Sequence, residues 1–253
     1  MSLDAFKVDD KVALVTGAST GLGQAIAVAL AEAGAQVSCH GNTRAPDVTC
    51  EAITKLGRRA FSVTGDLSDP TTPERLIADT INHFGRLDIL VNNAGTIRRA
   101  PAVDYSDEDW ATVIQVNLSS VFSLSRLAGH HMIEKGGGKI LNIASLLSFQ
   151  GGITVPAYAA AKGGVAQLTK ALANEWAAKG VNVNAIAPGY MRTDNTAALQ
   201  KDEQRNRQIL ERIPAGRWGE PSDLAGAAVF LCSAASAYIH GHVLVVDGGW
   251  MGR

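Results

Sequence analysis

The feature that most constrains the fold of this chain is a regular alternation of short apolar runs with longer helical segments. The apolar runs are continuous, as in Ile89-Leu90-Val91, and do not alternate between apolar and polar residues. Such runs are typical of parallel strands that are buried on both faces. Strands that alternate with helices along a chain predict a parallel sheet with helices on both sides. We therefore expect an α/β protein with a doubly wound parallel sheet between two layers of helices.

The positions of the expected elements follow from where glycine, proline and polar residues interrupt the apolar pattern. About seven strands are expected, at residues 11–16, 36–39, 60–64, 87–91, 139–144, 181–187 and 243–246. Helices are expected at residues 24–33, 48–56, 73–84, 107–134, 156–179, 202–213 and 221–233. No repeat, charge block or Gly/Ser-rich linker divides the chain, so we expect residues 1–253 to form a single domain.

The composition argues against several classes of protein. The chain is 46% hydrophobic and 19% charged, which suits a globular protein with a sizeable core. Its net charge of −1 gives no signal for nucleic acid or an anionic membrane, and no apolar run approaches the ~20 residues of a membrane span. Residues 1–10 lack the basic start and apolar run of a secretory signal. The cysteines are odd in number and lack metal-ligand spacing, which indicates reduced thiols in a cytoplasmic protein without a metal site: Cys39, Cys50 and Cys232.

A glycine-rich turn lies directly between the first expected strand and the first helix, and it reads Gly17-Ala18-Ser19-Thr20-Gly21-Leu22-Gly23. In this position glycines let the backbone approach a pyrophosphate, and the N–H groups and dipole of the following helix attract it. Ser19 and Thr20 add hydroxyl donors. The spacing is looser than the general dinucleotide fingerprint, and turns also collect glycine for steric reasons. The position after the first strand favours a nucleotide site.

Small or polar residues follow other strands at the same edge, where ligands bind in open α/β sheets. Asp66, with Leu67 beside it, can accept a hydrogen bond from an adenine amino group or can begin a helix. Asn93-Ala94-Gly95 after the fourth strand admits a ribose or a ring, although Asn and Gly are also common in turns. Ser145 ends the fifth strand and can bond a substrate oxygen or sit in a turn. Residues after the sixth strand can wall a nicotinamide: Pro188, Gly189, Met191 and Thr193.

Tyr158 and Lys162 are four residues apart in an expected helix for which Pro156 is a suitable first residue. Their side chains therefore lie on one face of the helix. A free tyrosine titrates near pH ~10, and a lysine ammonium beside it favours the phenolate and lowers that pKa. The phenol then becomes a usable general acid or base. Ordinary helix surfaces carry Tyr and Lys at this spacing too, so the pair alone decides nothing.

Asn117 falls on the apolar stripe of the long helix expected at residues 107–134, with core-facing positions at Trp110, Val113, Ile114, Val121 and Leu124. A buried amide needs hydrogen-bonding partners. It can satisfy nearby backbone groups, or it can hold a water molecule that continues a proton path. The sequence leaves both roles open.

Taken together, these motifs resemble the signature set of the short-chain dehydrogenase/reductase family: Gly17-x3-Gly21-x-Gly23, Asn92-Asn93-Ala94-Gly95, Asn117, Ser145, Tyr158-x3-Lys162 and Pro188-Gly189. The resemblance spans nearly the whole chain in the same order. It implies a Rossmann-type fold, usually tetrameric, that transfers hydride between NAD(P) and an alcohol or ketone. It also implies Tyr158 as general acid/base and Ser145 as the group that orients the substrate oxygen. Lys162 is implied to lower the pKa of Tyr158 and to bind the nicotinamide ribose, and Asn117 to hold a relay water.

Further stretches resemble one group within this family, the 2-deoxy-D-gluconate 3-dehydrogenases, also described as 2-dehydro-3-deoxy-D-gluconate 5-dehydrogenases: residues 96–99, 148–153, 187–191, 193–198, 212–218 and 246–250. This resemblance implies a small sugar-acid substrate with a carboxylate to be bound. Arg98 and Arg99 lie just past the expected cofactor turn, and guanidinium groups match carboxylates in geometry. The same two arginines can equally be a solvated surface pair. Gln150 is a further candidate for substrate contact.

The end of the second strand, Cys39-His40-Gly41-Asn42-Thr43-Arg44, bears on the choice between NAD and NADP. An acid there binds the ribose hydroxyls, and a base accepts a 2′-phosphate. Gly41 stands where the acid is expected, and Arg44 either suits a phosphate or faces water. The resembled group is mainly NAD-linked, so we expect NAD, with NADP as the alternative and Asn42 among the cofactor contacts.

Other functions share the same motifs. A 3-oxoacyl thioester reductase or a general sugar or polyol dehydrogenase would carry the same catalytic set. A protein that only senses a dinucleotide could use the same fold, because a fold does not by itself confer activity. The complete set of Asn117, Ser145, Tyr158 and Lys162 argues for an enzyme. The sugar acid, the carbon that is oxidised and the physiological direction are not determined by the sequence.

Overall fold

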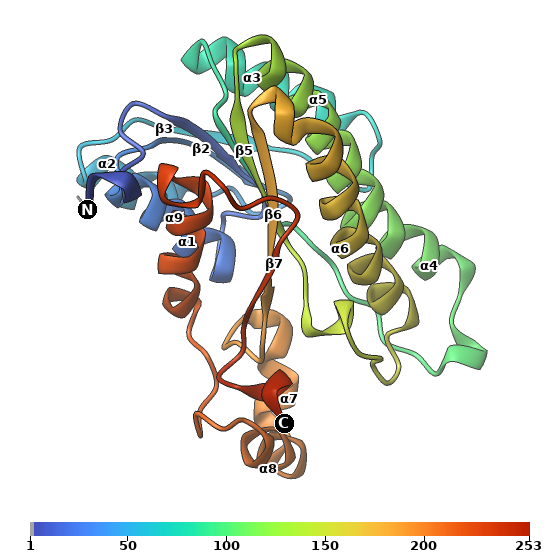
Figure 1. The fold of residues 1–253 in the computed structure, drawn as a ribbon. Coiled ribbons are helices and arrows are strands. Elements are labelled where there is room, and N and C mark those ends of the chain that lie inside the picture. The colour runs from blue at the N-terminus through green and yellow to red at the C-terminus, as the bar shows by residue number, and fades with distance from the viewer. Residues whose placement is uncertain (1–2) are drawn as a thin grey trace.

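A seven-stranded parallel sheet forms the centre of the computed structural model, which describes residues 3–253. The strand order is β3-β2-β1-β4-β5-β6-β7, and every neighbouring pair is parallel (Figure 1). The strands are β1 (Val12–Val15), β2 (Gln36–Gly41), β3 (Ala60–Thr64), β4 (Ile89–Asn92), β5 (Gly138–Ile143), β6 (Val181–Pro188) and β7 (Val243–Val246). The predicted doubly wound parallel sheet is confirmed.

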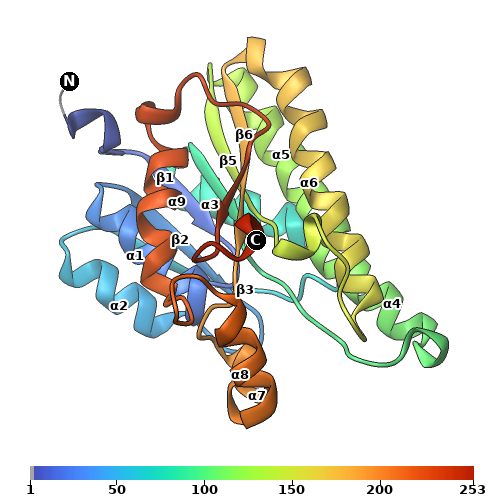
Figure 2. The same ribbon diagram turned by 60° about the horizontal axis from the view of Figure 1, so that its bottom comes forward.

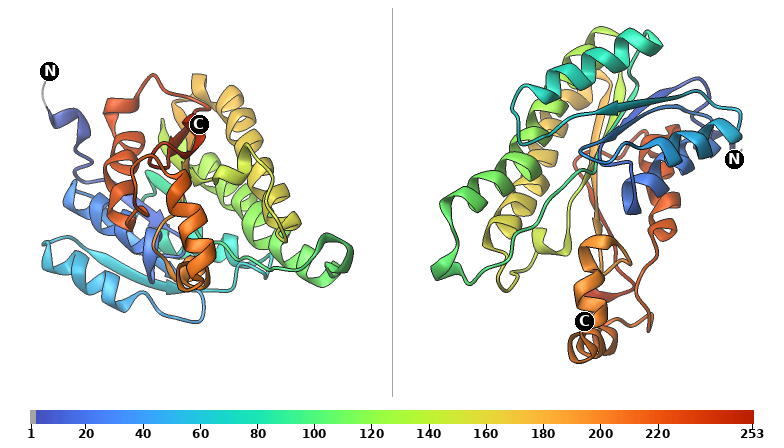
Figure 3. Two further views of the ribbon diagram at one scale, coloured as in Figure 1. Left: turned by 90° about the horizontal axis from the view of Figure 1, so that it is seen from below. Right: turned by 180° about the vertical axis from the view of Figure 1, so that it is seen from behind.

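Helices cover both faces of this sheet, which makes a three-layer α/β/α arrangement of the Rossmann type (Figures 1 and 3). One layer consists of α1 (Gly21–Glu32), α2 (Asp47–Lys55) and α9 (Ala225–Cys232). The other consists of α3 (Thr72–Phe84), α4 (Asp107–Ile114), α5 (Ser120–Glu134) and α6 (Pro156–Trp176). Two short helices, α7 (Ala197–Lys201) and α8 (Glu203–Arg212), extend beyond the carboxyl edge of the sheet (Figure 2).

Each helical layer packs on the sheet through its own apolar cluster. Ile26 and Leu30 of α1 are fully buried together with Leu231 of α9 against β1 and β2. On the other face, α3, α5 and α6 contribute Leu76, Leu124, Met132, Leu172 and Trp176. Burying one such side chain contributes about 1.5–3 kcal/mol, so both helical layers are held firmly against the strands.

The strand order reverses between β1 and β4, and this reversal creates the binding crevice. From β1 the chain first builds outward through β2 and β3, then crosses back so that β4 lies on the other side of β1. The loops after β1 and β4 therefore separate in opposite directions. In open parallel sheets, ligands bind at this point outside the carboxyl ends of the strands.

The helix expected over residues 107–134 differs from the prediction in two respects. A π-helical turn, Gln115–Ser119, separates α4 from α5. Trp110, expected in the core, is 44% exposed. The reason is that α4 extends past the sheet (Figure 1), so that a residue on its apolar stripe finds no strand to cover it. Asn117 is fully buried, as the stripe predicted.

Candidate active site

Two neighbouring cavities lie at the carboxyl edge of the sheet. The larger has a volume of about 380 Å³ and is lined by residues that include Gly17, His40, Asn42, Asp66 and Leu67. The smaller, about 170 Å³, is lined by residues that include Thr20, Gly21, Leu22, Asn93, Tyr158, Lys162 and Thr193. Both are bordered by Ala94 and Gly95. Much of the predicted cofactor set and two of the predicted catalytic residues are therefore brought together along one crevice.

The glycine turn after β1 has a backbone conformation that only glycine adopts readily. Gly17 and Gly21 have φ angles of 65° and 58°, in the left-handed region. A Cβ atom on Gly17 would also lie 3.0 Å from the Nδ2 atom of Asn93, and one on Gly23 would overlap the carbonyl oxygen of Gly17. Thr20 makes no side-chain cap, so it leaves the first N–H groups of α1 open to a ligand. This cradle fits the pyrophosphate of a dinucleotide.

Thr16, which the sequence analysis did not single out, ties the ends of β1 and β4 together. Its hydroxyl accepts hydrogen bonds from the backbone N–H groups of Asn93 and Ala94, both at 3.0 Å, and donates to the Val91 carbonyl at 3.2 Å. The Asn93 amide donates in turn to the carbonyls of Thr16 and Gly17, at 2.9 and 3.2 Å. Asn93 therefore shapes the glycine turn in addition to lining the crevice.

His40 fixes the other side of the turn, a role that nothing in the sequence indicates beyond its position at a strand end. Its Nδ1 atom accepts a hydrogen bond from the Gly17 N–H at 3.3 Å, and its Nε2 atom donates to the Gly65 carbonyl at 2.9 Å. Burial lowers the pKa of His40. The ring is therefore neutral, with its proton on Nε2, and it joins β1, β2 and the end of β3.

The end of β2 presents no carboxylate to the crevice, since Gly41 and Asn42 stand there. The Ser19 hydroxyl, predicted as a phosphate donor, donates to the Arg44 carbonyl at 2.6 Å. The hydroxyl proton of Ser19 is therefore used in a hydrogen bond within the loop. The Arg44 side chain is exposed. Asp66 accepts a hydrogen bond from the Ser68 N–H at 2.8 Å and at the same time lines the larger cavity.

Lys162 lies almost fully buried on the first turns of α6, with 5% of its surface exposed. Its ammonium donates a hydrogen bond to the Ile143 carbonyl at the end of β5. The nitrogen stands 5.6 Å from the centre of the Tyr158 ring. Burial lowers the pKa of Lys162 to about 8, because the charged form loses its hydration.

Tyr158 differs from the prediction in the direction of its pKa shift. Burial of the phenol raises its pKa, and the hydrogen bond with the Ser145 side chain and the charge of Arg99 oppose that shift only in part. We expected the Lys162 ammonium to lower this pKa. Instead the ammonium lies over the ring and bonds the Ile143 carbonyl, so it is not placed at the phenol oxygen.

Ser145 is held close to Tyr158 by the short helical turn that follows β5. Its hydroxyl accepts a hydrogen bond from the Leu147 N–H at 3.2 Å. The Ser148 hydroxyl accepts from the Ser145 N–H at 3.3 Å and donates to the Lys162 carbonyl at 2.7 Å. These bonds join the loop to α6, so the Ser145 and Tyr158 hydroxyls keep a fixed relation.

Asn117 uses its amide on backbone groups. Its Oδ1 atom accepts from the Thr96 N–H at 3.1 Å, and its Nδ2 atom donates to the carbonyls of Thr96 and Val113, at 2.8 and 2.9 Å. Of the two roles left open, this geometry favours the satisfaction of backbone groups. Asn117 lies in the π-helical turn, a local irregularity that is frequent at functional sites, and it anchors the loop that leads from Gly95 to the two arginines.

The two candidate substrate arginines have different environments. Arg98 is ion-paired with Asp109 at 3.4 Å and donates a hydrogen bond to the Thr96 hydroxyl at 3.1 Å. Arg99 has no ion-pair partner within residues 3–253, and its charge acts on Tyr158. Gln150 is half-buried in the loop after Ser145 and lines neither cavity.

The segment after β6 is divided between two sites. Thr193 lines the smaller cavity of the crevice. Gly189 and Met191 instead border a separate space of about 260 Å³, and Pro188 ends the fully buried strand β6. Met191 is buried against the core that supports α1. Pro188, Gly189 and Met191 therefore lie behind the crevice and do not line its two cavities.

None of the helices described in residues 3–253 has both the length and the apolar composition of a membrane span. No group of three or more His, Cys, Asp or Glu side chains in this range is placed to hold a metal ion.

Comparison with known proteins identifies the family to which this chain belongs. Residues 17–251 match the family described as enoyl-(acyl carrier protein) reductase. The 2-dehydro-3-deoxy-D-gluconate 5-dehydrogenase of Escherichia coli (strain K12) is 54% identical over 254 residues, which cover 100% of both chains. A crystal structure from Agrobacterium tumefaciens with bound NADP is 56% identical, with a TM-score of 0.92 over 98% of this chain and 99% of that one. The gluconate 5-dehydrogenase of Burkholderia cenocepacia J2315, in complex with NADP and tartrate, is 38% identical, with a TM-score of 0.94 over 100% of both chains.

The chain belongs to the short-chain dehydrogenase/reductase family. It is an NAD(P)-dependent oxidoreductase that acts on CH–OH groups. Along its whole length it is similar to the 2-dehydro-3-deoxy-D-gluconate 5-dehydrogenases.

The buried ammonium of Lys162 predicts a specific pH dependence of stability. Its pKa is about 8 in the folded protein against 10.5 for an ordinary lysine. Between these values the unfolded chain binds more protons, so this group makes the folded state more stable as the pH rises. The free energy of unfolding of the cofactor-free protein, measured relative to Lys162→Met, should increase by about 2 kcal/mol from pH 8 to pH 10. Urea unfolding of both proteins measures this difference.

Lys170→Met is the matched control for this experiment, since Lys170 lies on the exposed face of the same helix. The stability difference between wild type and this control should not change over the same pH interval. An equal pH dependence for the two variants would contradict the assigned environment of Lys162.

Proposed function

We propose that this enzyme transfers hydride between a nicotinamide cofactor and a secondary alcohol or ketone of a deoxy sugar acid, of the 2-deoxy-D-gluconate or 2-keto-3-deoxygluconate type. The observation that carries the proposal is the contact between the Tyr158 phenol and the Ser145 hydroxyl at the edge of the crevice that the glycine turn begins. The full-length similarity to sugar-acid dehydrogenases supports the class of substrate.

In this proposal Tyr158 moves the proton. When bound, the cofactor supplies or accepts the hydride. Tyr158 donates its phenolic proton to the carbonyl oxygen during reduction, and takes a proton from the hydroxyl oxygen during oxidation. The Ser145 hydroxyl bonds the same substrate oxygen and holds it against the phenol. The Lys162 ammonium is placed to bind ribose hydroxyls of the cofactor, since it lines the same cavity as Thr20 and Gly21.

The direction of the Tyr158 pKa shift bears on these two roles. Burial raises this pKa, so the phenol is protonated at neutral pH and suits the role of acid in ketone reduction. Its role as base in alcohol oxidation needs positive charge nearby. Arg99 is the cationic side chain whose charge favours the phenolate of Tyr158.

Replacing the phenol tests the assignment of the proton donor. Tyr158→Phe should lower kcat/KM by about 10²–10⁴-fold, the usual contribution of a positioned acid or base. The thermal midpoint and the affinity for NADPH should change little, because the ring remains. Steady-state kinetics on the keto sugar acid, with NADPH fluorescence titration, provide the two readouts.

Tyr105→Phe is the control variant, because the Tyr105 hydroxyl bonds only the Arg98 carbonyl, at 3.3 Å. It should keep nearly full activity. Unchanged turnover in Tyr158→Phe would show that Tyr158 is not the proton donor. Absence of turnover in the wild type with every alcohol and ketone would favour a dinucleotide-sensing protein.

We further propose that Arg99, more than Arg98, binds the substrate carboxylate. Arg98 is already paired with Asp109. Arg99 is exposed, and its charge reaches the Tyr158 phenol. A guanidinium without a partner can bond both oxygens of a carboxylate.

Two arginine variants separate these possibilities. Arg99→Ala should lower kcat/KM for the sugar acid by about tenfold or more, since a hydrogen bond to a charged group contributes about 1.5–3 kcal/mol. Activity on a neutral polyol should fall less, because there Arg99 acts only through its charge on the Tyr158 phenol. Arg98→Ala should have a smaller effect on the acid. If both variants lose activity equally on the acid and the polyol, neither arginine recognises the carboxylate.

One alternative function has an observation in its favour. The matched family is described as enoyl-(acyl carrier protein) reductase, and acyl carrier proteins present their substrates as thioesters. A 3-oxoacyl thioester reductase would use the same Ser145 and Tyr158. A general sugar or polyol dehydrogenase is also compatible with these residues. Substrate profiling with 2-deoxygluconate, 3-deoxy-2-ketogluconate isomers, gluconate and an acyl thioester distinguishes them, because only the first proposal requires a sugar carboxylate.

The end of β2 supports use of NADP as well as NAD. No carboxylate in the described part of β2 or its following loop faces the crevice to repel a 2′-phosphate. Two of the similar solved structures carry NADP. The preference for NAD stays a prediction, as do the homotetramer, the cytoplasmic location and the single domain. We propose that the chain accepts both cofactors because Asn42 offers neither attraction nor repulsion by charge.

Placing a carboxylate at this position tests that account. Asn42→Asp should lower kcat/KM for NADP by about tenfold or more through like-charge repulsion. Activity with NAD should be retained, because the new carboxylate can bond ribose hydroxyls. Kinetics with both cofactors measure the ratio in variant and wild type. An equal change for NAD and NADP would mean that position 42 does not face the ribose.

A further inference from the structure

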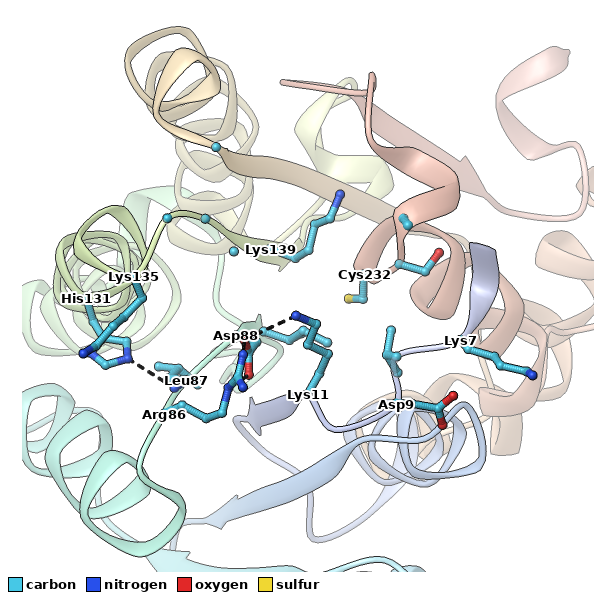
Figure 4. Close-up of a pocket in the computed structure, with 18 of the residues that line it drawn as sticks. Lys7, Asp9, Lys11, Arg86, Leu87, Asp88, His131, Lys135, Lys139 and Cys232 are labelled. Atoms are coloured by element: carbon cyan, nitrogen blue, oxygen red, sulfur yellow. Dashed lines mark hydrogen bonds and ion pairs between the residues drawn. The ribbon is translucent and has the colours of Figure 1, made fainter. Parts of the chain in front are cut away.

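A second and larger cavity lies at the opposite edge of the sheet from the crevice (Figure 4). Its volume is about 680 Å³, and it is formed by the segments that precede β1, β4 and β5 together with the end of α9. None of the residues proposed here for cofactor, substrate or proton transfer lines it. The size of this cavity therefore needs an explanation that the oxidoreductase site does not give.

Positive charge is concentrated in this cavity. Five Lys and Arg side chains and two Asp side chains line it, so its formal charge is 5 − 2 = +3 in a chain whose net charge is −1. The C-terminal ends of α3, α5 and α9 also border it and contribute about −0.5 each. A positive balance of about +1.5 remains after this correction. The lining cations are Lys7, Lys11, Arg86, Lys135 and Lys139.

Only part of this charge is neutralised within the protein. Asp88 accepts both guanidinium hydrogen bonds of Arg86, at 2.6 and 2.7 Å, and also faces Lys11 at 3.7 Å. Lys7 is paired with Asp4 at 2.8 Å. Within residues 3–253, Lys135 and Lys139 have no ion-pair partner.

Lys139 is the more constrained of the two unpaired lysines. It is the second residue of β5, it is half-buried, and its side chain rises beside the cavity from the strand (Figure 4). Burial lowers its pKa, because the ammonium loses hydration without gaining a counter-charge. Lys135 lies at the end of α5 beside His131, on the side of the space away from Lys139 (Figure 4). An anion beside Lys139 would supply the missing charge.

Glycine backbone forms part of the cavity wall. Two glycine turns, at residues 136–138 and at Gly180, approach so closely that a Cβ atom on Gly137 would lie 2.7 Å from the Gly180 carbonyl oxygen. These positions therefore carry no side chain that could fill the space. His131 does not add charge, since its Nε2 atom accepts a hydrogen bond from the Leu87 N–H at 3.3 Å and burial lowers its pKa.

We propose that this cavity is a second ligand site, for a small multivalent anion of the phosphate class, held by the ammonium group of Lys139 with support from Lys11. Phosphate is favoured over a carboxylate because the free cations are ammonium groups. These act as point charges toward phosphate oxygens, whereas the one guanidinium fork in the cavity is already occupied by Asp88.

Isothermal titration of the NADPH-saturated enzyme with inorganic pyrophosphate tests the proposal. Saturation with NADPH keeps the cofactor's own phosphate cradle filled, and sodium chloride holds the ionic strength constant. One pyrophosphate should bind per chain. Lys139→Met should weaken this binding about tenfold or more, the usual effect of losing a charge-assisted hydrogen bond. Lys11→Met should weaken it severalfold. Because Lys11 is exposed, this variant also tests the proposal if Lys139→Met fails to fold.

Lys55→Met, on the exposed surface of α2, is the control with the same loss of charge, and it should bind pyrophosphate as the wild type does. Three results would overturn the proposal: no binding to the NADPH-saturated enzyme, binding that NADPH abolishes, or equal weakening in all three variants. The last would indicate non-specific attraction to the surface.

Discussion

The hydrogen bonds between the ends of β1 and β4 are the contacts on which the rest of the crevice depends. One hydroxyl, that of Thr16, accepts from two backbone N–H groups of the loop after β4, and one amide, that of Asn93, donates back to two carbonyls of the turn after β1. Leaving such buried groups unpaired would cost about 1–3 kcal/mol each. The two loops diverge where the strand order reverses, yet these bonds hold their first residues in contact. The position of the glycine turn and the start of α1 follow from this connection.

A buried polar network extends the same constraint toward the proton-transfer residues. The Asn92 amide donates to Asn142 on β5 at 2.8 Å and to Ser125 on α5 at 3.0 Å. Asn142 donates to Thr169 on α6 at 2.9 Å. Two strands and two helices are thus fixed by directional bonds inside an apolar layer, where any misalignment would leave polar groups unsatisfied. Because α6 also carries Tyr158 and Lys162, this network and the bond from Lys162 to the Ile143 carbonyl set their distance from the strand ends.

The sequence predicted the elements and strand-end residues well because those signals are local. Continuous apolar runs and the glycines that end them located all seven strands to within about two residues, the normal uncertainty of such boundaries. The roles of Thr16 and His40 could not be predicted, because their partners lie up to 78 residues away and the side chains themselves are unremarkable in a strand. The same is true of the Tyr158 pKa. Helical spacing places Lys162 on the same face, but only the tertiary structure shows that burial outweighs the lysine and that the ammonium is directed to a carbonyl. The two unpaired lysines at the amino edge of the sheet, Lys135 and Lys139, could not be predicted either, because they do not form a short sequence motif.

Direct hydride transfer requires that the substrate carbon and the nicotinamide meet in one crevice, beside Tyr158. The most direct measurement is reduction of the keto sugar acid in ordinary water with a reduced cofactor that carries deuterium at both positions of C4 of the nicotinamide. Direct transfer predicts one deuterium on the newly formed carbinol carbon, and the NMR spectrum of the product also identifies that carbon. A product without deuterium would contradict direct transfer and the assembly of the site described here.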